Sequence, residues 1–516
     1  MPMADASELT EWLASGEAFA ASGPVGRIDT HAASIFLNGE TAWKIKRPVD
    51  LGYLDFSTPD KRRTALEAEL RLNRRTAPDL YKTVHSVARD QDGALAIGGD
   101  GEVVDWILEM RRFPDGALWS DLADSNALNE AALRNLADAL VGFHSKAQIA
   151  WPGDGAARIG QIVAGNAAAM ALYPDILDPK SVSELTERLV RLIDHNSGLL
   201  DARGKAGRIR HVHGDLHLAN IATIDGVPTP FDCLEFDAEL ATTDILYDLA
   251  FLLMDLWQRG LRREANMVFN RYLDLSPDDE GAVGLMPLFM SVRACIRAHV
   301  SAARAKRGGA GDAGEDAAHY LELACRLVID ERPGLIAIGG LSGTGKSTLA
   351  RALGADFGKP PGARILRSDV LRKRLAGVFA ETPLPASGYT AEASRATYMA
   401  LDGLAWAALA TGQGVIADAV FGMAEERDAI EEVAGRADCP FTGLWLELPE
   451  VGRIARVAER PPDASDATAD VVRAQSQNLT SIPANWARLT SDASLETLAS
   501  TARLLLDPLV LIATEK

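Results

Sequence analysis

Residues 335–353 of this chain read LIAIGGLSGTGKSTLARAL, and this stretch determines the fold of the C-terminal part. An apolar run is followed by Gly340-x-x-x-x-Gly345-Lys346-Ser347 and then by a helix-like sequence. In the order strand, loop and helix, this pattern predicts a P-loop, whose backbone N–H groups turn inward around phosphate oxygens. The helix adds the positive end of its dipole. The sequence therefore predicts a phosphate-binding site here.

The P-loop residues are expected to hold ATP and Mg²⁺. The glycines let backbone N–H groups approach phosphate, Lys346 reaches the terminal phosphates, and the Ser347 hydroxyl coordinates Mg²⁺. The ATP-binding set is predicted to be Gly340, Ser342, Gly343, Thr344, Gly345, Lys346, Ser347 and Thr348, with Ser347 also the metal ligand.

After the P-loop, strand-like and helix-like patterns alternate, which predicts an α/β domain with a mostly parallel sheet. Asp369 and Asp418 each end a buried strand, and the carboxyl ends of parallel strands line the ligand crevice. Arg372 follows Asp369 by one helical turn. We expect Asp369 to be the catalytic base of this half, with Asp418 as the alternative.

The segment RIARVAERPPDASDA, residues 453–467, is predicted to begin as a helix with one basic face. Arg453, Arg456 and Arg460 fall at i, i+3 and i+7, on the same side. This spacing is typical of a lid that neutralises a transferring phosphate, and a solvated basic face is the alternative.

Residues 335 to about 480 resemble the small P-loop kinases, the group of polynucleotide 5′-kinase, gluconate kinase and zeta toxin. The segment RSDVLR matches the part of these enzymes that faces the substrate. The resemblance implies that Asp369 is the base, that Arg372 holds the substrate, and that Arg456 and Arg460 act from the lid.

Residues 211–220, HVHGDLHLAN, are compatible with a zinc cage or with a phosphate-transfer loop. In the zinc reading, Leu216 puts His217 out of step with the dizinc pattern, and the only later histidines, His299 and His319, lie in expected helices. In the kinase reading, His213-Gly214-Asp215-x-x-x-x-Asn220 follows a catalytic-loop spacing, with Asp215 accepting the proton of the acceptor hydroxyl. The second reading is favoured.

The residues after this loop predict a hairpin whose turn is Asp225-Gly226. Pairing 224 with 227 and continuing outward brings Asn220 opposite Phe231 and beside Asp232. An amide oxygen and a carboxylate at one point are hard ligands suited to Mg²⁺. A first hairpin is predicted around Asn38-Gly39, followed by a helix over 58–78.

HGDLHLAN, FDCLEFD (231–237) and TAWKIKRP (41–48) resemble the aminoglycoside phosphotransferase family, small-molecule kinases built on the protein-kinase fold. The resemblance implies an α+β protein-kinase-like domain that binds ATP and Mg²⁺. Within it, Asp215 would be the base and Asn220 and Asp232 the metal ligands. The residues implied to bind ATP are Lys44 (or Lys46, on the same strand face), its partner Glu69 (or Glu67), and the hinge backbone around Glu109 to Arg111.

The segments LDFSTPDKRR and EAELRLNRRTAPDLY resemble a two-domain group in which a phosphotransferase-like half is fused to a P-loop half. The predicted domains are a kinase-like domain over 1–305, a linker with a short helix over 306–333, and a P-loop kinase domain over 334–516.

The composition of the chain argues against several classes of protein. With 53 basic and 72 acidic residues the net charge is −19, which makes nucleic acid an unlikely partner. The four cysteines form no Cys-x-x-Cys pair, and the sequence has neither a signal-peptide pattern nor an expected membrane span. A cytoplasmic protein is expected, with its oligomeric state open.

The favoured function is an ATP-dependent phosphotransferase with two nucleotide sites that act on small-molecule hydroxyl or amino acceptors. Two alternatives stay open. One half could be a nucleotide-sensing regulatory module, or the C-terminal half could be a nucleic-acid 5′-kinase.

Overall fold

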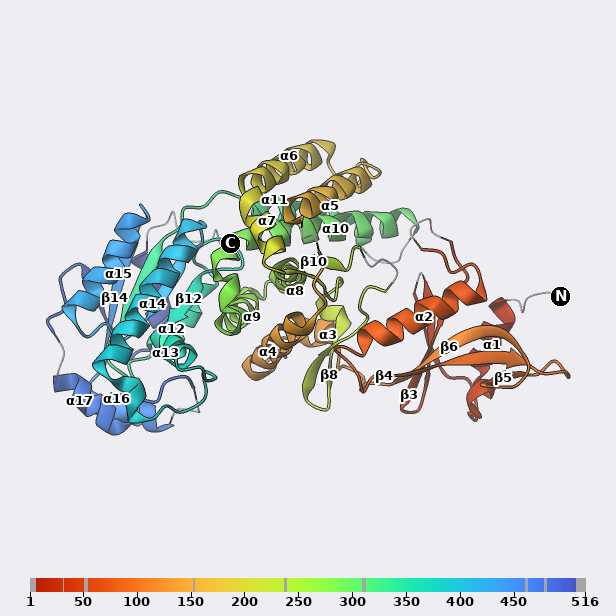
Figure 1. The fold of residues 1–516 in the computed structure, drawn as a ribbon, viewed down its shortest axis with the longest axis horizontal. Helices are drawn as coiled ribbons and strands as arrows, with labels where there is room; N and C mark the ends of the chain where they lie inside the picture. Colours follow the sequence, from red (N-terminus) through yellow and green to blue (C-terminus); the bar gives the residue numbers. More distant parts are fainter. Residues whose placement is uncertain are drawn as a thin grey trace. The chain divides into compact units, whose positions relative to one another are not determined.

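The computed structural model describes residues 6–30, 32–50, 54–151, 154–235, 239–308, 312–459, 463–477 and 480–506. The chain forms two compact units: residues 1–153 with 203–248, and residues 154–202 with 249–516. Figure 1 labels the helices and strands of both units. The predicted boundary at 306–333 falls inside the second unit, and the predicted domains remain a prediction.

A six-stranded antiparallel sheet forms the main part of the first unit. Its order is β1 (Gly26–Asp29), β2 (Ala33–Asn38), β3 (Thr41–Lys46), β6 (Glu102–Arg111), β4 (Tyr81–Arg89) and β5 (Leu95–Ile97). Asn38 pairs with Thr41, so the β2–β3 turn is Gly39-Glu40, one residue later than predicted. Gly39 has a positive φ of 57°, which determines where the chain turns.

Helix α2 (Pro59–Asn73) covers one face of this sheet. It begins where Thr58 accepts a hydrogen bond from the Lys61 N–H, with Pro59 in the first turn. Leu66 packs with Tyr81, Leu108 and Met110 in one core. On the other face, Phe36 and Ile45 pack with α1 (Ala6–Ser15). Because side chains alternate along β3, Lys44 and Lys46 both face α2 while Ile45 faces α1.

The rest of the first unit carries the loops. Strand β7 (Ile209–His211) pairs with β10 (Thr242–Asp244), and β8 (Ile221–Ile224) forms a hairpin with β9 (Val227–Pro230). Helices α3 (Trp119–Asp124) and α4 (Glu130–Lys146) lie between the sheet and these elements in sequence. The β8–β9 register pairs Ile224 with Val227 and Ile221 with Pro230, as predicted from the Asp225-Gly226 turn.

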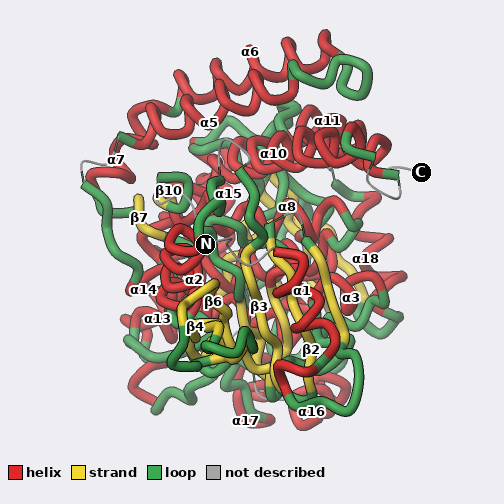
Figure 2. Tube along the Cα trace, turned by 90° about the vertical axis from the view of Figure 1, so that its right-hand side faces the viewer, coloured by secondary structure: helices red, strands yellow, loops and turns green. Residues whose placement is uncertain are grey.

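The second unit contains a five-stranded parallel sheet of order β12 (Arg364–Arg367), β13 (Val415–Asp418), β11 (Leu335–Gly339), β14 (Phe441–Glu447) and β15 (Trp486–Thr490). The predicted α/β fold with a parallel sheet is confirmed. Ile336 and Ile338 share a core with α12 (Lys346–Gly354) and α18 (Leu495–Leu504). Helices α14 (Ala391–Ala410) and α15 (Ala424–Arg436) also pack on the sheet. Figure 2 shows strands β2, β3, β4 and β6 of the first unit's sheet.

Helices precede this sheet in the same unit: α5 (Gly155–Met170), α6 (Pro179–His195), α9 (Arg262–Leu275), the 3₁₀ segment η3 (Pro277–Leu285), α10 (Met286–Lys306) and α11 (Ala313–Leu327). The chain passes from one unit to the other within α7 (Ser197–Lys205) and again within α8 (Ile245–Gln258). Pro277–Lys306 contains an 18-residue stretch with the mean hydropathy (1.3) of a membrane span, but 78% of that stretch is buried inside the protein. Such burial is typical of a core helix.

Candidate active sites

In the first unit, a ladder of alternating charges connects β3 to α2. Lys44 Nζ lies 2.6 Å from Glu69 Oε1 and 3.0 Å from Asp232 Oδ1. Lys46 Nζ lies 2.7 Å from Glu69 Oε2 and 2.6 Å from Glu235 Oε1. Glu69 is fully buried between the two lysines. Burial alone would lower the pKa of Lys44, but Asp232 and Glu69 outweigh it and raise that pKa well above its ordinary value.

This ladder shows how the two lysines and the two glutamates pair, while their roles in binding ATP stay a prediction. Glu69 faces both lysines, whereas Glu67 is exposed and pairs with Arg63 on the surface of α2. Lys44, not Lys46, also contacts Asp232, the predicted metal ligand. Both lysines share Glu69, and they differ in the other carboxylate that each contacts, Asp232 for Lys44 and Glu235 for Lys46.

The predicted catalytic loop lies at the base of the β8–β9 hairpin. Asn220 Nδ2 donates to Asp215 Oδ2 at 2.9 Å, and His217 Nε2 lies 3.4 Å from the same oxygen. Phe231 N–H donates to Asn220 O at 2.9 Å, so the hairpin brings Asn220 next to Asp232 as expected. The structure thus brings four predicted site residues together: Asp215, Asn220, Asp232 and Lys44.

Asp232 has an unusual backbone and a perturbed carboxyl group. Its φ is +60°, a conformation that non-glycine residues rarely adopt and that is associated with functional sites. Tyr81 Oη accepts its N–H at 3.2 Å. Burial raises the pKa of Asp232, but Lys44 and Lys46 outweigh burial and leave the pKa below its ordinary value. The carboxylate is therefore charged, as a metal ligand must be.

Asp248 on α8 anchors the loop, and the sequence analysis did not identify this role. Its oxygens accept the N–H groups of His213 at 3.2 Å and Gly214 at 2.9 Å. His144 Nε2 lies 3.1 Å from the same carboxylate. His213 is buried, with Nε2 3.0 Å from Phe231 O. Among the described residues, no group of three or more His, Cys, Asp or Glu side chains is arranged to hold a metal.

The residues expected to form the hinge, Glu109 to Arg111, lie at the end of β6. Glu109 is inside the sheet, paired with Trp43 on one side and Thr83 on the other, and its carboxylate lies 2.8 Å from His85 Nε2. Arg111 ends β6 and forms a two-pronged ion pair with Asp225 at 2.6 and 2.8 Å. Their contact with adenine stays a prediction.

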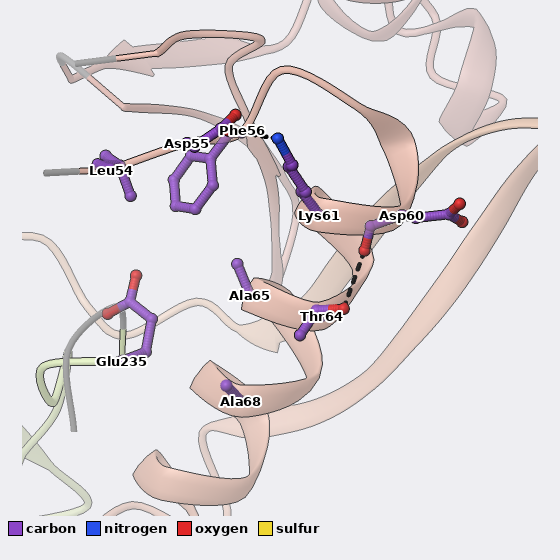
Figure 3. A pocket seen from close by; sticks show the side chains of 9 residues that line it. All are labelled: Leu54, Asp55, Phe56, Asp60, Lys61, Thr64, Ala65, Ala68 and Glu235. Carbon is purple, nitrogen blue, oxygen red and sulfur yellow. Dashed lines mark hydrogen bonds and ion pairs between the residues drawn. The ribbon is translucent and has the colours of Figure 1, made fainter. Parts of the chain in front are cut away.

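A pocket of 390 Å³ lies on the outer side of α2, next to the ladder. Figure 3 shows the Glu235 carboxylate facing the space beneath Leu54 and Phe56, beside Ala65 and Ala68. Burial raises the pKa of Glu235, and Lys46 opposes that shift. This pocket gives small molecules access to the Glu235 end of the ladder.

In the second unit, the P-loop adopts the expected strand–loop–helix form between β11 and α12. Gly340, Gly343 and Gly345 have φ values of 142°, 86° and 91°. A Cβ at Gly343 would lie 2.5 Å from the Arg453 carbonyl oxygen, so no side chain fits there. Ser347 and Thr348 lie in the first turn of α12. The loop thus has the conformation and the donors that fit phosphate and Mg²⁺.

The carboxyl ends of the strands bring the predicted acidic residues together. Asp418 ends β13 in register with Ile338 and Arg367, and Arg367 Nε lies 3.5 Å from Asp418 Oδ2. Asp369 follows β12 in the first turn of α13 (Ser368–Leu375). Burial raises the pKa of Asp369 above its ordinary value, Asp418 adds to the shift, and Arg367 and Lys346 oppose it. These charges surround one position next to the P-loop.

The arginines after Asp369 and in the lid have specific partners. Arg372 stacks on Tyr389 with its guanidinium 5.0 Å from the ring centre and donates to Gly388 O. Arg456, on α16 (Glu450–Glu459), donates to Thr344 O at 3.5 Å and therefore reaches the P-loop.

Arg453 is instead buried and donates to Ser476 Oγ of α17 (Ala469–Gln477) at 2.8 Å. Its expected place on the phosphate-facing side is wrong, because it fastens α17 to α16. Arg460 lies outside the described residues.

The loop after the lid carries partners that the sequence analysis missed. Asp463 forms a two-pronged pair with Arg367 at 3.1 and 2.7 Å, and Asp466 Oδ2 lies 2.7 Å from Lys373 Nζ. The two aspartates of the segment PDASDA, so soon after the lid helix, were the available signal in the sequence. A pocket of 430 Å³ also adjoins the P-loop, lined by Leu341, Thr344, Trp445, Leu446, Glu447, Leu448, Pro449, Arg453 and Thr490.

Comparisons with known proteins cover both parts of the chain. The family model of the AAA domain matches residues 335–482. Rv2004c and MT2060 of Mycobacterium tuberculosis and Mb2027c of Mycobacterium bovis are each 30% identical over 454 residues, which is 86% of this chain and 88% of theirs. The resemblance to a group that spans nearly the whole chain is thereby confirmed.

Among solved structures, a gluconokinase from Sinorhizobium meliloti 1021 is 21% identical, with a TM-score of 0.25, over 34% of this chain and 95% of its own. A choline/ethanolamine kinase family protein from Mesorhizobium loti is 11% identical, with a TM-score of 0.37, over 62% of this chain and 92% of its own. The chain's own sheets and motifs give a protein-kinase-like N-terminal fold and a P-loop kinase fold after it. Kinase-like folds in both halves support a phosphotransferase.

Proposed function

We propose that this chain is an ATP- and Mg²⁺-dependent phosphotransferase with two nucleotide sites. The chain belongs to the family of the mycobacterial proteins Rv2004c, MT2060 and Mb2027c. The observation that carries the proposal is that each half holds its own set of groups. Lys44, Glu69, Asp215, Asn220 and Asp232 gather in the first unit. The P-loop and Asp369 gather in the second. The two sets share no residue.

In the N-terminal site, Lys44 would bind phosphate oxygens and Glu69 would hold Lys44 in place. Asn220 and Asp232 would hold Mg²⁺, which supplies charge neutralisation for the transferring phosphate when bound. Asp215 would accept the proton of the acceptor hydroxyl or amine while the acceptor oxygen or nitrogen bonds to the γ-phosphorus of ATP. The bond from that phosphorus to the β–γ bridging oxygen would break, and ADP would leave. The hydrogen bond from Asn220 orients the Asp215 carboxylate for this step.

In the C-terminal site, the P-loop amides and Lys346 would bind the phosphates, and Ser347 would hold Mg²⁺. Asp369 would accept the acceptor proton, and Arg456 would neutralise charge on the phosphate from the lid side of the loop. The pocket beside the P-loop falls in the size range of small-ligand sites and could take the nucleotide base.

Charge pairing supports small neutral or cationic acceptors for the C-terminal site. Two cations near Asp369, Arg367 and Lys373, are already paired with the lid-loop carboxylates Asp463 and Asp466. A nucleic-acid 5′-kinase needs cations that neutralise backbone phosphates, and the net charge of −19 opposes such binding. A small-molecule acceptor is therefore preferred over a nucleic acid.

The regulatory alternative has one observation in its favour. The β2–β3 turn contains a single glycine, Gly39, so the N-terminal site lacks a full glycine-rich cover for phosphates. In that alternative the N-terminal half would sense nucleotide without transferring phosphate.

An ATP-consumption screen over sugars, amino-sugars, aminoglycosides, nucleosides and oligonucleotides tests the proposal. The screen is run with wild type, Asp215→Asn and Lys346→Ala. We expect acceptor-dependent turnover of two kinds, one lost in each variant. Turnover lost only in Lys346→Ala would support the regulatory alternative, and turnover with oligonucleotides alone would support the nucleic-acid kinase.

A further inference from the structure

Strand β12 leads directly to Asp369, and its outer edge is held by a side chain from α9. As the end strand of the sheet, β12 pairs with β13 on one side only. An edge strand leaves backbone groups unpaired on its other side. Here Asn270 Oδ1 accepts the Ile365 N–H at 2.7 Å, and Asn270 Nδ2 donates to Ala363 O at 3.0 Å. One amide side chain thus takes the place of a neighbouring strand.

The first residue of β12 is anchored by charge. Arg364 is fully buried, and its guanidinium donates to Glu280 Oε2 at 3.0 Å, Glu280 Oε1 at 2.7 Å and Asp274 Oδ1 at 2.8 Å. It also donates to Asn270 Oδ1 at 3.0 Å and Ile365 O at 2.9 Å. A guanidinium has five N–H donors, and these five acceptors satisfy that number. The start of β12 is therefore held firmly by α9 and η3.

The packing beside this anchor leaves no room for adjustment. Asn266 of α9 donates to Pro361 O at 3.2 Å and Ala363 O at 3.0 Å. A Cβ on Gly354 would lie 2.6 Å from Asn266 Oδ1, and one on Gly362 would lie 2.8 Å from Asn266 Nδ2. Helix α9 and the segment before β12 are therefore tightly packed against each other.

The other end of β12 lies in the C-terminal site. Arg367 pairs with Asp418 and Asp463, and Asp369 follows two residues later. The four residues of β12 span roughly 13 Å in extended form. A shift at Arg364 would therefore act on Asp369 through a strand of only four residues.

We propose that Asn270 and Glu280 are positioning residues of the C-terminal site, which act through β12 to place Asp369 against the acceptor hydroxyl. Both precede residue 306, in the part of the sequence assigned to the kinase-like domain. Helix α9 and η3 are then a working part of the C-terminal enzyme. This inference rests on the proposed role of Asp369 as base.

The test uses the full chain with Asp215→Asn as the parent, so that transfer in the N-terminal site is silenced. Asn270→Asp keeps the oxygen for Ile365 N–H but loses the donor to Ala363 O, and Glu280→Gln removes one charge from the Arg364 anchor. Arg263→Gln on the exposed side of α9 is the matched control. Turnover that depends on Lys346 is measured with water and with the acceptors of the screen.

We expect both variants to lower kcat by about 10- to 100-fold, the size of effect of a small misplacement of a catalytic group. KM for ATP and the number of bound ATP analogues should stay as in the parent, because the P-loop lies on β11 and α12. In an Asp369→Asn background the same changes should cost less than about twofold more, since they act through Asp369.

Three results would overturn the inference. These are an unchanged kcat, a kcat loss that accompanies loss of ATP binding, and an undiminished further loss in the Asp369→Asn background. The last two would give Asn270 and Glu280 a role in holding the fold only. If the parent has no turnover that depends on Lys346, the proposed function of the C-terminal half fails, and the inference fails with it.

Discussion

Lys44 of β3 and Glu69 of α2 form a buried ion pair, with Nζ 2.6 Å from Oε1 and the glutamate fully buried. Lys46 occupies the second oxygen of the same carboxylate. By sequence, either lysine could be the one that binds the phosphates of ATP. In the structure they differ in their second partner, which is Asp232 for Lys44 and Glu235 for Lys46.

The first prediction separates these lysines. Lys44→Met should abolish transfer at the N-terminal site, because it removes the cation next to Asp232, the proposed metal ligand. Lys46→Met should leave measurable transfer but destabilise the fold by about 3–5 kcal/mol, the cost of removing one partner from a buried pair. Turnover and urea unfolding are compared for both. Full turnover in Lys44→Met would assign the phosphate-binding role to Lys46.

The second prediction counts nucleotide sites. Calorimetric titration with a non-hydrolysable ATP analogue should find two sites in wild type and in Asp215→Asn, and one in Lys346→Ala. The reason is that Lys346 meets phosphate directly while Asp215 acts on the acceptor. One site in wild type that disappears in Lys346→Ala would mean that the N-terminal half does not bind nucleotide.

The third prediction concerns pH and Asp369. A base works when deprotonated, and burial raises the pKa of Asp369 above its ordinary value. Turnover at the C-terminal site should therefore be full at high pH and fall, as pH decreases, already above the usual aspartate range near 3.9. Asp369→Asn should cut transfer by about 100-fold or more and remove this acidic limb, with ATP binding kept. A loss of nucleotide binding would instead make Asp418 the better candidate for the base.

The fourth prediction concerns metal. The ligands assigned here are oxygens, from Asn220 and Asp232 in one site and Ser347 in the other, and oxygen ligands select Mg²⁺ over zinc. Chelation by EDTA should stop turnover, and added Mg²⁺ should restore it without zinc. Stoichiometric zinc in the purified protein, with activity lost on its removal, would contradict the assignment of residues 211–220.

The sequence by itself determined the features that depend on neighbours along the chain. The P-loop follows from a glycine spacing between a strand and a helix, and the meeting of Asn220 with Asp232 follows from the Asp225-Gly226 turn and outward pairing. Asp369 and Asp418 were placed at one edge because parallel strands end together. Turn geometry and periodicity act over a few residues, so they can be read directly.

Only the tertiary structure decided which charges meet. Lys44 pairs with a carboxylate 188 positions away, and Arg364 is enclosed by Asp274 and Glu280, 90 and 84 positions before it. Arg453 has the spacing of a lid residue, yet it is buried against α17. The periodicity of the sequence shows which side chains lie on the same face of a helix or strand. Which other element packs against that face depends on the whole fold. The fold therefore also decides which opposite charge lies next to a buried charged group.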